Sequence, residues 1–196
     1  MVMPALHRGW TAADVRLLIE ESPPGPRYEL VRGELLVTPA PSAAHQLAAG
    51  AILRVLDDYL DANPVGWACH SPADLELQPD NVLQPDVFVV RAGSRGPGAD
   101  PAKWAGVTSL LLAVEVVSPS SARFDRVTKR DFYLEADVAE YWVIDVTARA
   151  VERWTREATR PRIEHGQLEW QPAGATVPLK VDLPALFSRI DKKIRL

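Results

Sequence analysis

Two acidic residues lie beside strongly apolar runs, where a buried active site would need them. Glu115 is the one charged residue of LLLAVEVV (residues 110–117), and Asp86 follows Pro85 at the start of DVFVV. An ionised carboxylate is costly to bury without a cation, a metal or a proton. If the two runs form neighbouring strands, both carboxylates converge at one end of a sheet. Oxygen-seeking Mg²⁺ or Mn²⁺ would suit this pair, with the backbone carbonyl of Val116 as a further ligand.

A structural role is the competing interpretation of these acids. A lone buried glutamate is often only ion-paired or protonated, and a Pro-Asp step commonly ends a strand or begins a turn. The two acids together are more specific than either alone. We therefore expect Asp86 and Glu115 to be catalytic residues that bind the metal.

Lys129 is the candidate catalytic cation. It lies on a helix expected at about residues 126–137, four residues after Asp125. In one interpretation the two residues form an exposed pair of the kind found on many helix surfaces. In the other, the ammonium group points back over the end of the sheet, toward a water or a phosphate held by the metal.

Hydrophobic periodicity predicts the elements that position these residues. Helices are expected at 11–21 with Thr11 as N-cap, at 43–62 with Ser42 as N-cap, at 126–137, and as a short segment from Pro184. Strands are expected within 28–38, then at about 67–70, 75–78, 84–90, 110–117, 141–146, 150–155, 168–171 and 176–181, with a loop at 157–167. Within its strand, Glu115 should share a face with Leu111, Ala113 and Val117. This order predicts a mixed α/β (α+β) fold with a central sheet flanked by helices.

Composition narrows the class of protein. A chain of 196 residues with 47% apolar and 24% charged residues is typical of one globular domain. The net charge of −4 gives no overall attraction to nucleic acid, so any such site must be a local basic patch. Cys69 has no cysteine to pair with, and no leader or long apolar run is present. We therefore expect a cytoplasmic protein that does not enter the membrane.

A local basic patch is present near Lys129. Arg123, Arg126 and Arg130 surround it in the sequence, interrupted by one aspartate. We expect these three arginines to contact nucleic-acid phosphates. The glycine-rich segment 91–103, which has further basic residues, is a second candidate contact.

Several motifs resemble the Uma-type restriction-endonuclease-like family of the PD-(D/E)xK nuclease superfamily, long catalogued as a domain of unknown function. They are YELVRGELLVTPAPSAAHQ, PDVFVV, LLAVEVVSPSS and DRVTKRDFYLEADVAEYWVIDV, which span about residues 10–190. The resemblance implies a restriction-endonuclease-like core of a helix, three antiparallel strands, a helix and a further strand. It also implies a Mg²⁺-dependent endonuclease that acts on DNA, and a homodimer.

The resemblance assigns roles residue by residue. Asp86 matches the superfamily aspartate, and Glu115 matches the acidic residue before x-Lys. The position of that lysine is here Val117, which cannot position a nucleophile or neutralise a phosphorane. Lys129 on the following helix is the matching residue, and Arg130 is the alternative.

Two further polar residues match recurrent family positions and are expected to support the site. His45 begins the core helix, where many superfamily members have a supporting glutamate, and Glu34 follows the Arg-Gly turn. Ordinary structural roles compete with both assignments. His45 would then be a core histidine hydrogen-bonded near Ser42, and Glu34 a charge on an edge strand.

The preferred function is metal-dependent hydrolysis of phosphodiester bonds in DNA. Asp86 and Glu115 would hold Mg²⁺ or Mn²⁺, and Lys129 would orient the water or stabilise the transition-state oxygens. The alternative is a noncatalytic nucleic-acid-binding or regulatory protein with the same fold, which Val117 and the acidic net charge favour. A third class is a structural homodimer that meets partners through its tryptophans: Trp104, Trp142, Trp154 and Trp170.

Overall fold

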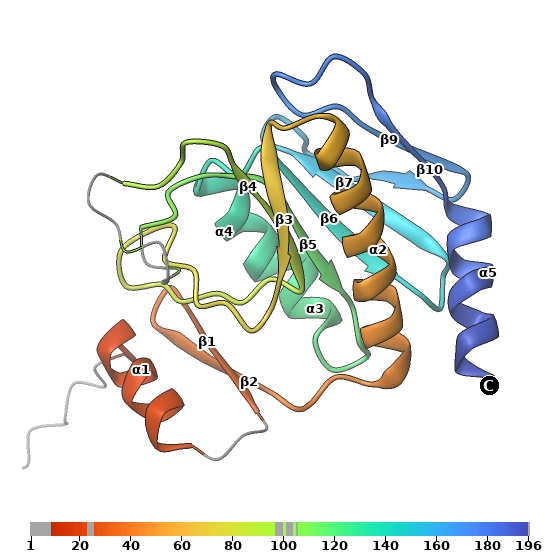
Figure 1. Cartoon of the computed structure of the whole chain (residues 1–196). Coiled ribbons are helices and arrows are strands. Elements are labelled where there is room, and N and C mark those ends of the chain that lie inside the picture. Colours follow the sequence, from red (N-terminus) through yellow and green to blue (C-terminus); the bar gives the residue numbers. More distant parts are fainter. Residues whose placement is uncertain (1–8, 23–25, 97–99, 101–103, 105, 196) are drawn as a thin grey trace, which may run out of the picture.

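The computed structural model describes residues 9–22, 26–96, 100, 104 and 106–195. Its centre is a six-stranded mixed sheet in the order β3-β4-β5-β6-β7-β8 (Figure 1). The strands are β3 (Gly66–His70), β4 (Val87–Arg91), β5 (Leu110–Val116), β6 (Glu140–Asp145), β7 (Ala150–Thr155) and β8 (Arg162–Glu164). Strands β5 and β6 run parallel, and the other neighbours are antiparallel. The predicted mixed α/β class is confirmed.

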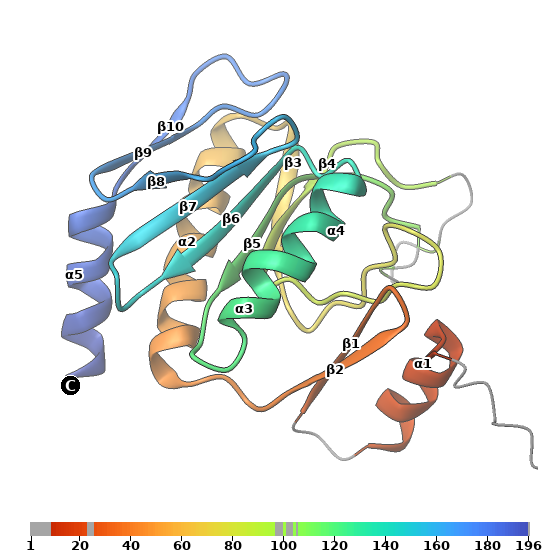
Figure 2. The same cartoon turned by 180° about the vertical axis from the view of Figure 1, so that it is seen from behind.

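Helices cover both faces of this sheet (Figures 1 and 2). Helices α2 (Ala43–Ala62) and α5 (Leu183–Ile194) lie on one face, and α4 (Arg130–Glu135) lies on the other. Because strand side chains alternate, Val87 and Val89 of β4 pack on the α2 side, while Phe88 and Val90 pack on the α4 side. Each face therefore buries its own apolar cluster.

A separate hairpin lies beside the sheet, made of β1 (Arg27–Val31) and β2 (Glu34–Thr38). Its turn places Arg32 and Gly33 at positive φ, 54° and 80°, a conformation that glycine adopts readily. Helix α1 (Ala12–Glu21) packs against the hairpin through Val15 and Leu30. Leu30 and Val82 exchange backbone hydrogen bonds of 2.7 and 2.9 Å, which tie the hairpin to the segment that leads into β4.

Helix caps confirm several predicted boundaries. Thr11 and Asp14 form a capping box at the start of α1. Ser42 accepts the His45 N–H at the start of α2. The final helix is longer than predicted, because Asp182 caps it and it continues for 12 residues, to Ile194. Helix α5 follows a ladder of β9 (Gln167–Trp170) and β10 (Leu179–Asp182).

Four local predictions were wrong. Residues 75–78 are not a strand, since only one isolated bridge forms there, between Leu75 and Leu83. The loop predicted at 157–167 contains β8, which extends the sheet beyond β7. The helix predicted at 126–137 already begins at α3 (Ala122–Phe124) and contains a π-helical turn, η1 (Asp125–Lys129). Leu111 packs on the α2 side, because a register shift opposite Val89 and Val90 breaks the alternation of β5.

The tryptophans do not support a structural homodimer. Trp142, Trp154 and Trp170 are buried, and Trp104 is partly buried against Phe88. A surface rich in tryptophan is therefore absent from the described part of the chain.

The residues that the structure describes include no helix long and apolar enough to cross a bilayer.

Candidate active site at the end of the central sheet

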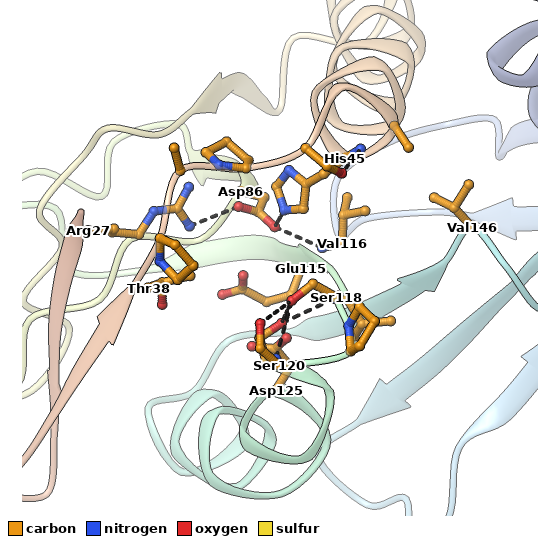
Figure 3. A pocket seen from close by; sticks show the side chains of 18 of the residues that line it. Arg27, Thr38, His45, Asp86, Glu115, Val116, Ser118, Ser120, Asp125 and Val146 are labelled. Atoms are coloured by element: carbon orange, nitrogen blue, oxygen red, sulfur yellow. Dashed lines mark hydrogen bonds and ion pairs between the residues drawn. The ribbon is translucent and has the colours of Figure 1, made fainter. Parts of the chain in front are cut away.

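A cavity of about 320 Å³ lies where β5 ends and β4 begins, between the β1–β2 hairpin and the start of α2 (Figure 3). Asp86 comes directly before β4, and Glu115 is the penultimate residue of β5. Because these strands are antiparallel neighbours, the start of β4 and the end of β5 lie side by side, and both carboxylates lie at the same end of the sheet. Lys129 also lines the cavity, so the three predicted catalytic residues are brought together.

Asp86 is held by three donors. Arg27 Nη1 lies 2.8 Å from Oδ1, while His45 Nε2 and the Val116 N–H each lie 2.8 Å from Oδ2. A carboxylate has about four lone-pair positions, so one remains for another ligand. Burial alone would raise the pKa of Asp86, but the hydrogen bond and charge of His45, together with Arg27, hold it at about 2. Asp86 is therefore ionised and fixed in orientation.

Lys129 is buried among acids. Its Nζ lies 2.8 Å from Glu29 Oε1, 2.9 Å from Glu115 Oε1 and 3.8 Å from Asp125 Oδ1. Burial opposes the charged form, but the charges of Glu115, Glu29 and Asp125 outweigh it and raise the pKa of Lys129 above its ordinary value. Asp125 and Lys129 are both buried, so the interpretation in which they form an exposed helix-surface pair is wrong. Lys129 is a permanent cation and cannot act as a general base.

Within the described residues, the hydrogen bonds that Glu115 accepts are on one oxygen, Oε1. Lys129 Nζ donates to Oε1 at 2.9 Å, and the Tyr133 hydroxyl donates to the same atom at 3.1 Å. Burial raises the pKa of Glu115 well above its ordinary value; Lys129 opposes this, and the nearby carboxylates add to it. The pKa of Lys129 and the pKa of Glu115 are both raised. The pKa of Lys129 does not depend on Glu115 alone, because its ammonium group also faces Glu29 and Asp125.

The π-helical turn brings Asp125 and Lys129 inward. The Arg130 N–H bonds to the Asp125 carbonyl, one residue further back than in an α-helix. Both Asp125 and Lys129 are buried within this turn, whereas Val127 is exposed. Burial raises the pKa of Asp125, although Lys129 and the Ser121 hydroxyl act against it.

The buried cluster has more acidic side chains than permanent cations. Four buried acids (Glu29, Asp86, Glu115 and Asp125) face only two permanent cations, Arg27 and Lys129. No group of three or more His, Cys, Asp or Glu side chains among the described residues is arranged to hold a metal ion. Mg²⁺ does not require such a group, because it commonly uses one or two carboxylates and completes its shell with waters and substrate phosphates. The oxygen donors of Asp86 and Glu115 fit that mode.

The two supporting residues differ in their placement. His45 lines the cavity and binds Asp86, with its Nδ1 buried and without a hydrogen-bond partner in the described structure. Glu34 does not line the cavity. It pairs with Val31 at the turn end of the hairpin, whereas the open end, where Arg27 pairs with Thr38, faces the site. Strand geometry therefore keeps Glu34 from the acids.

The predicted phosphate contacts are largely neutralised. Arg126 donates to Glu152 Oε1 at 2.6 Å and to Asp145 Oδ2 at 2.9 Å. Arg130 pairs with Asp131, and its guanidinium lies 4.8 Å from the centre of the Trp154 ring.

Arg123 is exposed, and it makes no ion pair with any described residue. In the second predicted contact, residues 91–103, positions 97–99 and 101–103 (with Lys103) lie outside the described residues.

Two site residues were not found from the sequence: Arg27 and Glu29. Glu29 is buried, lies next to Lys129 and accepts the Gln84 N–H at 2.8 Å. A signal for it existed, because Glu29 stands between Tyr28 and Leu30 as an isolated acid in an apolar strand. The same signal had singled out Glu115.

A family model named Uma2, described as "Putative restriction endonuclease", matches residues 13–188. The chain belongs to the Uma2 family. This confirms the family that the motifs resemble. No curated protein matches the chain.

A solved structure supports the same fold. It is titled as a "putative nuclease belonging to DUF820" from Anabaena variabilis ATCC 29413. The match has a TM-score of 0.69 and 19% identity, and it covers 90% of this chain and 98% of the other. At this identity the likeness shows a shared fold.

Proposed function

We propose that this Uma2 protein is a metal-dependent nuclease that hydrolyses phosphodiester bonds in DNA. The observation that carries the proposal is the buried cluster of acids around Lys129 at the cavity. Four buried acids surround two permanent cations, Arg27 and Lys129, so the acidic side chains outnumber the cations by two. A divalent cation would balance this excess. Membership of a family described as restriction endonucleases supports the same chemistry.

Asp86 and Glu115 would hold the cation, with the backbone carbonyl of Val116 as a further ligand. A bound Mg²⁺ or Mn²⁺ supplies an activated water and stabilises charge on the phosphate oxygens. Asp86 offers one coordination position while Arg27 and His45 keep its carboxylate in place. These two residues are positioning residues, since they act through Asp86.

Lys129 would act as a fixed positive charge near the scissile phosphate. Its ammonium group donates to Glu115 and is anchored by Glu29. Because it remains protonated, its contribution is electrostatic stabilisation of the transition-state oxygens. This role replaces that of the superfamily lysine at the position of Val117, from a different element of the fold.

The test combines metal binding with cleavage. Mn²⁺ binding is measured by isothermal titration calorimetry. Nicking of negatively supercoiled plasmid, in which torsional stress favours opening of short unpaired segments, is followed with Mg²⁺ or Mn²⁺. Glu115→Gln retains an oxygen that can accept from Lys129 and Tyr133 but removes a carboxylate ligand, so we expect it to fold. Glu115→Gln and Asp86→Asn should each weaken Mn²⁺ binding and reduce nicking by about 10²-fold or more, a loss typical of an essential catalytic group.

A matched control separates the site from the surface. Glu169 is a half-exposed carboxylate of β9 that pairs with Lys180, far along the chain from the cavity residues. Glu169→Gln should bind Mn²⁺ and nick plasmid as the wild type does. Nicking that persists unchanged in both Glu115→Gln and Asp86→Asn would contradict the proposal.

A noncatalytic nucleic-acid-binding protein is the second candidate. Arg27 and Lys129 already neutralise part of the acidic cluster without a metal, and His45 lies 2.8 Å from Asp86. DNA binding that requires no divalent cation, together with no calorimetric signal for Mn²⁺, would favour this candidate over the hydrolase.

A further inference from the structure

We infer that the substrate enters this site as an unpaired strand or chain end and not as intact duplex DNA. The inference rests on the proposed hydrolase function and specifies its substrate class. It is drawn from the depth of the reactive groups, the size and walls of the cavity, and the charge of the surrounding surface.

The reactive groups are almost fully buried at the cavity. Asp86 is 5% exposed, and Glu115 and Lys129 are each 2% exposed. A group that acts on a phosphate must come within hydrogen-bond distance of it, directly or through one water. Enzymes that draw a nucleotide into a closed pocket, as base-modifying enzymes do, act on single-stranded substrate or extrude the nucleotide from the helix. The scissile phosphate must therefore enter the cavity.

The cavity is of nucleotide size. Its volume of about 320 Å³ is at the lower end of the range for small-molecule pockets. A double helix, whose major groove alone is about 12 Å wide, cannot enter a space of this volume. One unpaired nucleotide with its phosphate is a ligand of the appropriate scale.

The walls of the cavity suit a nucleotide that has left its partner strand. Leu36, Pro39 and Pro41 provide apolar surface from the hairpin and its link to α2. The hydroxyl groups of Ser118 and Ser120 lie 3.0 Å apart and line the same cavity (Figure 3). Apolar surface accepts the faces of a sugar or base, and hydroxyl groups provide donors and acceptors for its polar edges.

The three arginines expected to contact phosphates do not provide a duplex track. Of the three arginines expected to contact phosphates, Arg126 is held by Asp145 and Glu152, and Arg130 is held by Asp131. Affinity for duplex DNA depends mainly on cations that neutralise phosphates. With Arg123 alone of the three outside such a pair, this patch has one arginine left for duplex phosphates.

Binding is tested with the Glu115→Gln variant, which prevents turnover. Fluorescence anisotropy compares an unpaired oligonucleotide of about 12 nucleotides, within the range that single-strand sites cover, with a blunt hairpin duplex of the same sequence. We expect the unpaired form to bind at least about tenfold more tightly. Its log–log salt slope should have a magnitude of about 1, against about 3 for a protein that neutralises three duplex phosphates. Equal or tighter binding of the blunt duplex would overturn the inference.

Cleavage distinguishes failure of this inference from failure of the proposed function. With Mg²⁺, the wild-type protein should cut the unpaired oligonucleotide and the single-stranded arms of a forked duplex, and should leave the blunt hairpin largely intact. Comparable rates on the blunt hairpin would overturn the inference and leave the hydrolase function standing. Failure to cut either substrate with any divalent cation would overturn the hydrolase function, and the inference with it.

A pair of alanines tests whether the strand uses the cavity. Ala40 lines the cavity, and Ala43, at the start of α2, does not; both are exposed, so neither substitution disturbs a packed core. Ala40→Trp should weaken binding of the unpaired oligonucleotide by about tenfold or more, because the indole occupies the nucleotide space. Ala43→Trp should bind as the parent does. Unchanged binding by Ala40→Trp would show that the strand lies elsewhere and would overturn the inference.

Discussion

At the scale of single residues, the site depends on a balance of buried charge. Lys129 contacts Glu29 and Glu115 within 3 Å. All three side chains are buried, so bulk water contributes little to the solvation of their charges. Removing one partner of a buried ion pair leaves an uncompensated charge in a medium that solvates it poorly. Lys129 is therefore a structural requirement of the fold as well as a proposed catalytic cation.

We expect Lys129→Met to lower the free energy of unfolding by roughly 3–5 kcal/mol, because it leaves buried carboxylates without their cation. Adding Glu29→Gln should recover part of the loss, since it removes one of those negative charges. Urea unfolding at pH 7 measures both effects. Lys180→Met is the control: Lys180 is largely exposed, and its change should stay within about 0.5 kcal/mol. A loss no larger than that of the control would contradict the charge balance described here.

Asp145 predicts a specific pH dependence of stability. Burial by itself would raise its pKa, but the Ala148 N–H and the Arg126 guanidinium hold the pKa of Asp145 below its ordinary value. The folded protein therefore binds this proton less readily than the unfolded chain. Asp145 stabilises the fold above the unfolded-state pKa of about 3.9, and this contribution is lost as the pH falls through the lower folded pKa.

Asp145→Asn should accordingly lower the urea midpoint at pH 7, and its difference from the wild type should shrink as the pH is brought below about 3.9. Urea titrations at a series of pH values measure this. Asp58→Asn, at an exposed position of α2, serves as control and should show little difference throughout. A constant difference between Asp145→Asn and the wild type at every pH would refute the linkage.

Much of the site was predictable because its acids interrupt apolar runs. Asp86 and Glu115 were identified in this way, and the antiparallel pairing of β4 with β5 brings them together as expected. Arg27 and Glu29 were missed for a geometric reason. The sequence predicts the strand pair, but it does not indicate which end of the hairpin faces the sheet. The prediction therefore fell on Glu34, which lies at the end away from the site.

At the scale of elements, close backbone approach explains one glycine of the sheet. A Cβ on Gly66 of the edge strand β3 would lie 2.3 Å from the Val90 carbonyl oxygen of β4. No real side chain tolerates that distance without movement of the backbone. The glycine therefore sets how closely β3 pairs with the strand that carries Asp86 at its start.

Gly66→Ala should lower the free energy of unfolding by about 1–3 kcal/mol, the usual cost of overpacking. Gly166→Ala is the matched control, because a Cβ there has no heavy atom within 4 Å. Urea unfolding of both variants makes the comparison, and equal stability of the two would mean that β3 shifts freely.

Two features at this scale lie beyond hydrophobic periodicity. The residue types of the π-helical turn Asp125–Lys129 would also be typical of an α-helix. We attribute its extra residue per turn to the contacts of Lys129 with acids on other elements. The register shift opposite Val89 and Val90 likewise depends on how β4 and β5 pack. Both are tertiary outcomes, which local sequence cannot specify.

At the scale of the whole molecule, stability and site are carried by different regions. The cluster on the α2 side includes Phe187 and Ile190 of α5, which are buried and do not line the cavity. The charged cluster lies at one end of the sheet, where β4 begins and β5 ends, between the hairpin and η1. Damage to the apolar cluster should therefore lower stability without altering the chemistry.

Phe187→Ala should cost roughly 3–5 kcal/mol of folding free energy, as expected for an aromatic side chain removed from a core. Mn²⁺ affinity per folded molecule should stay at the wild-type value. Thermal unfolding and calorimetric titration of the same sample test both statements. A weakened Mn²⁺ affinity in fully folded Phe187→Ala would show that α5 and the site are coupled.

The β1–β2 hairpin belongs to its own ladder, and this has a consequence for how the protein can vary. A chain shortened to start at Ser42 would keep every backbone hydrogen bond of the six-stranded sheet, yet Asp86 would lose Arg27 and Lys129 would lose Glu29. Exchange of this one leading segment between relatives would thus change the electric field and the mouth of the pocket together, while the scaffold beneath stayed the same.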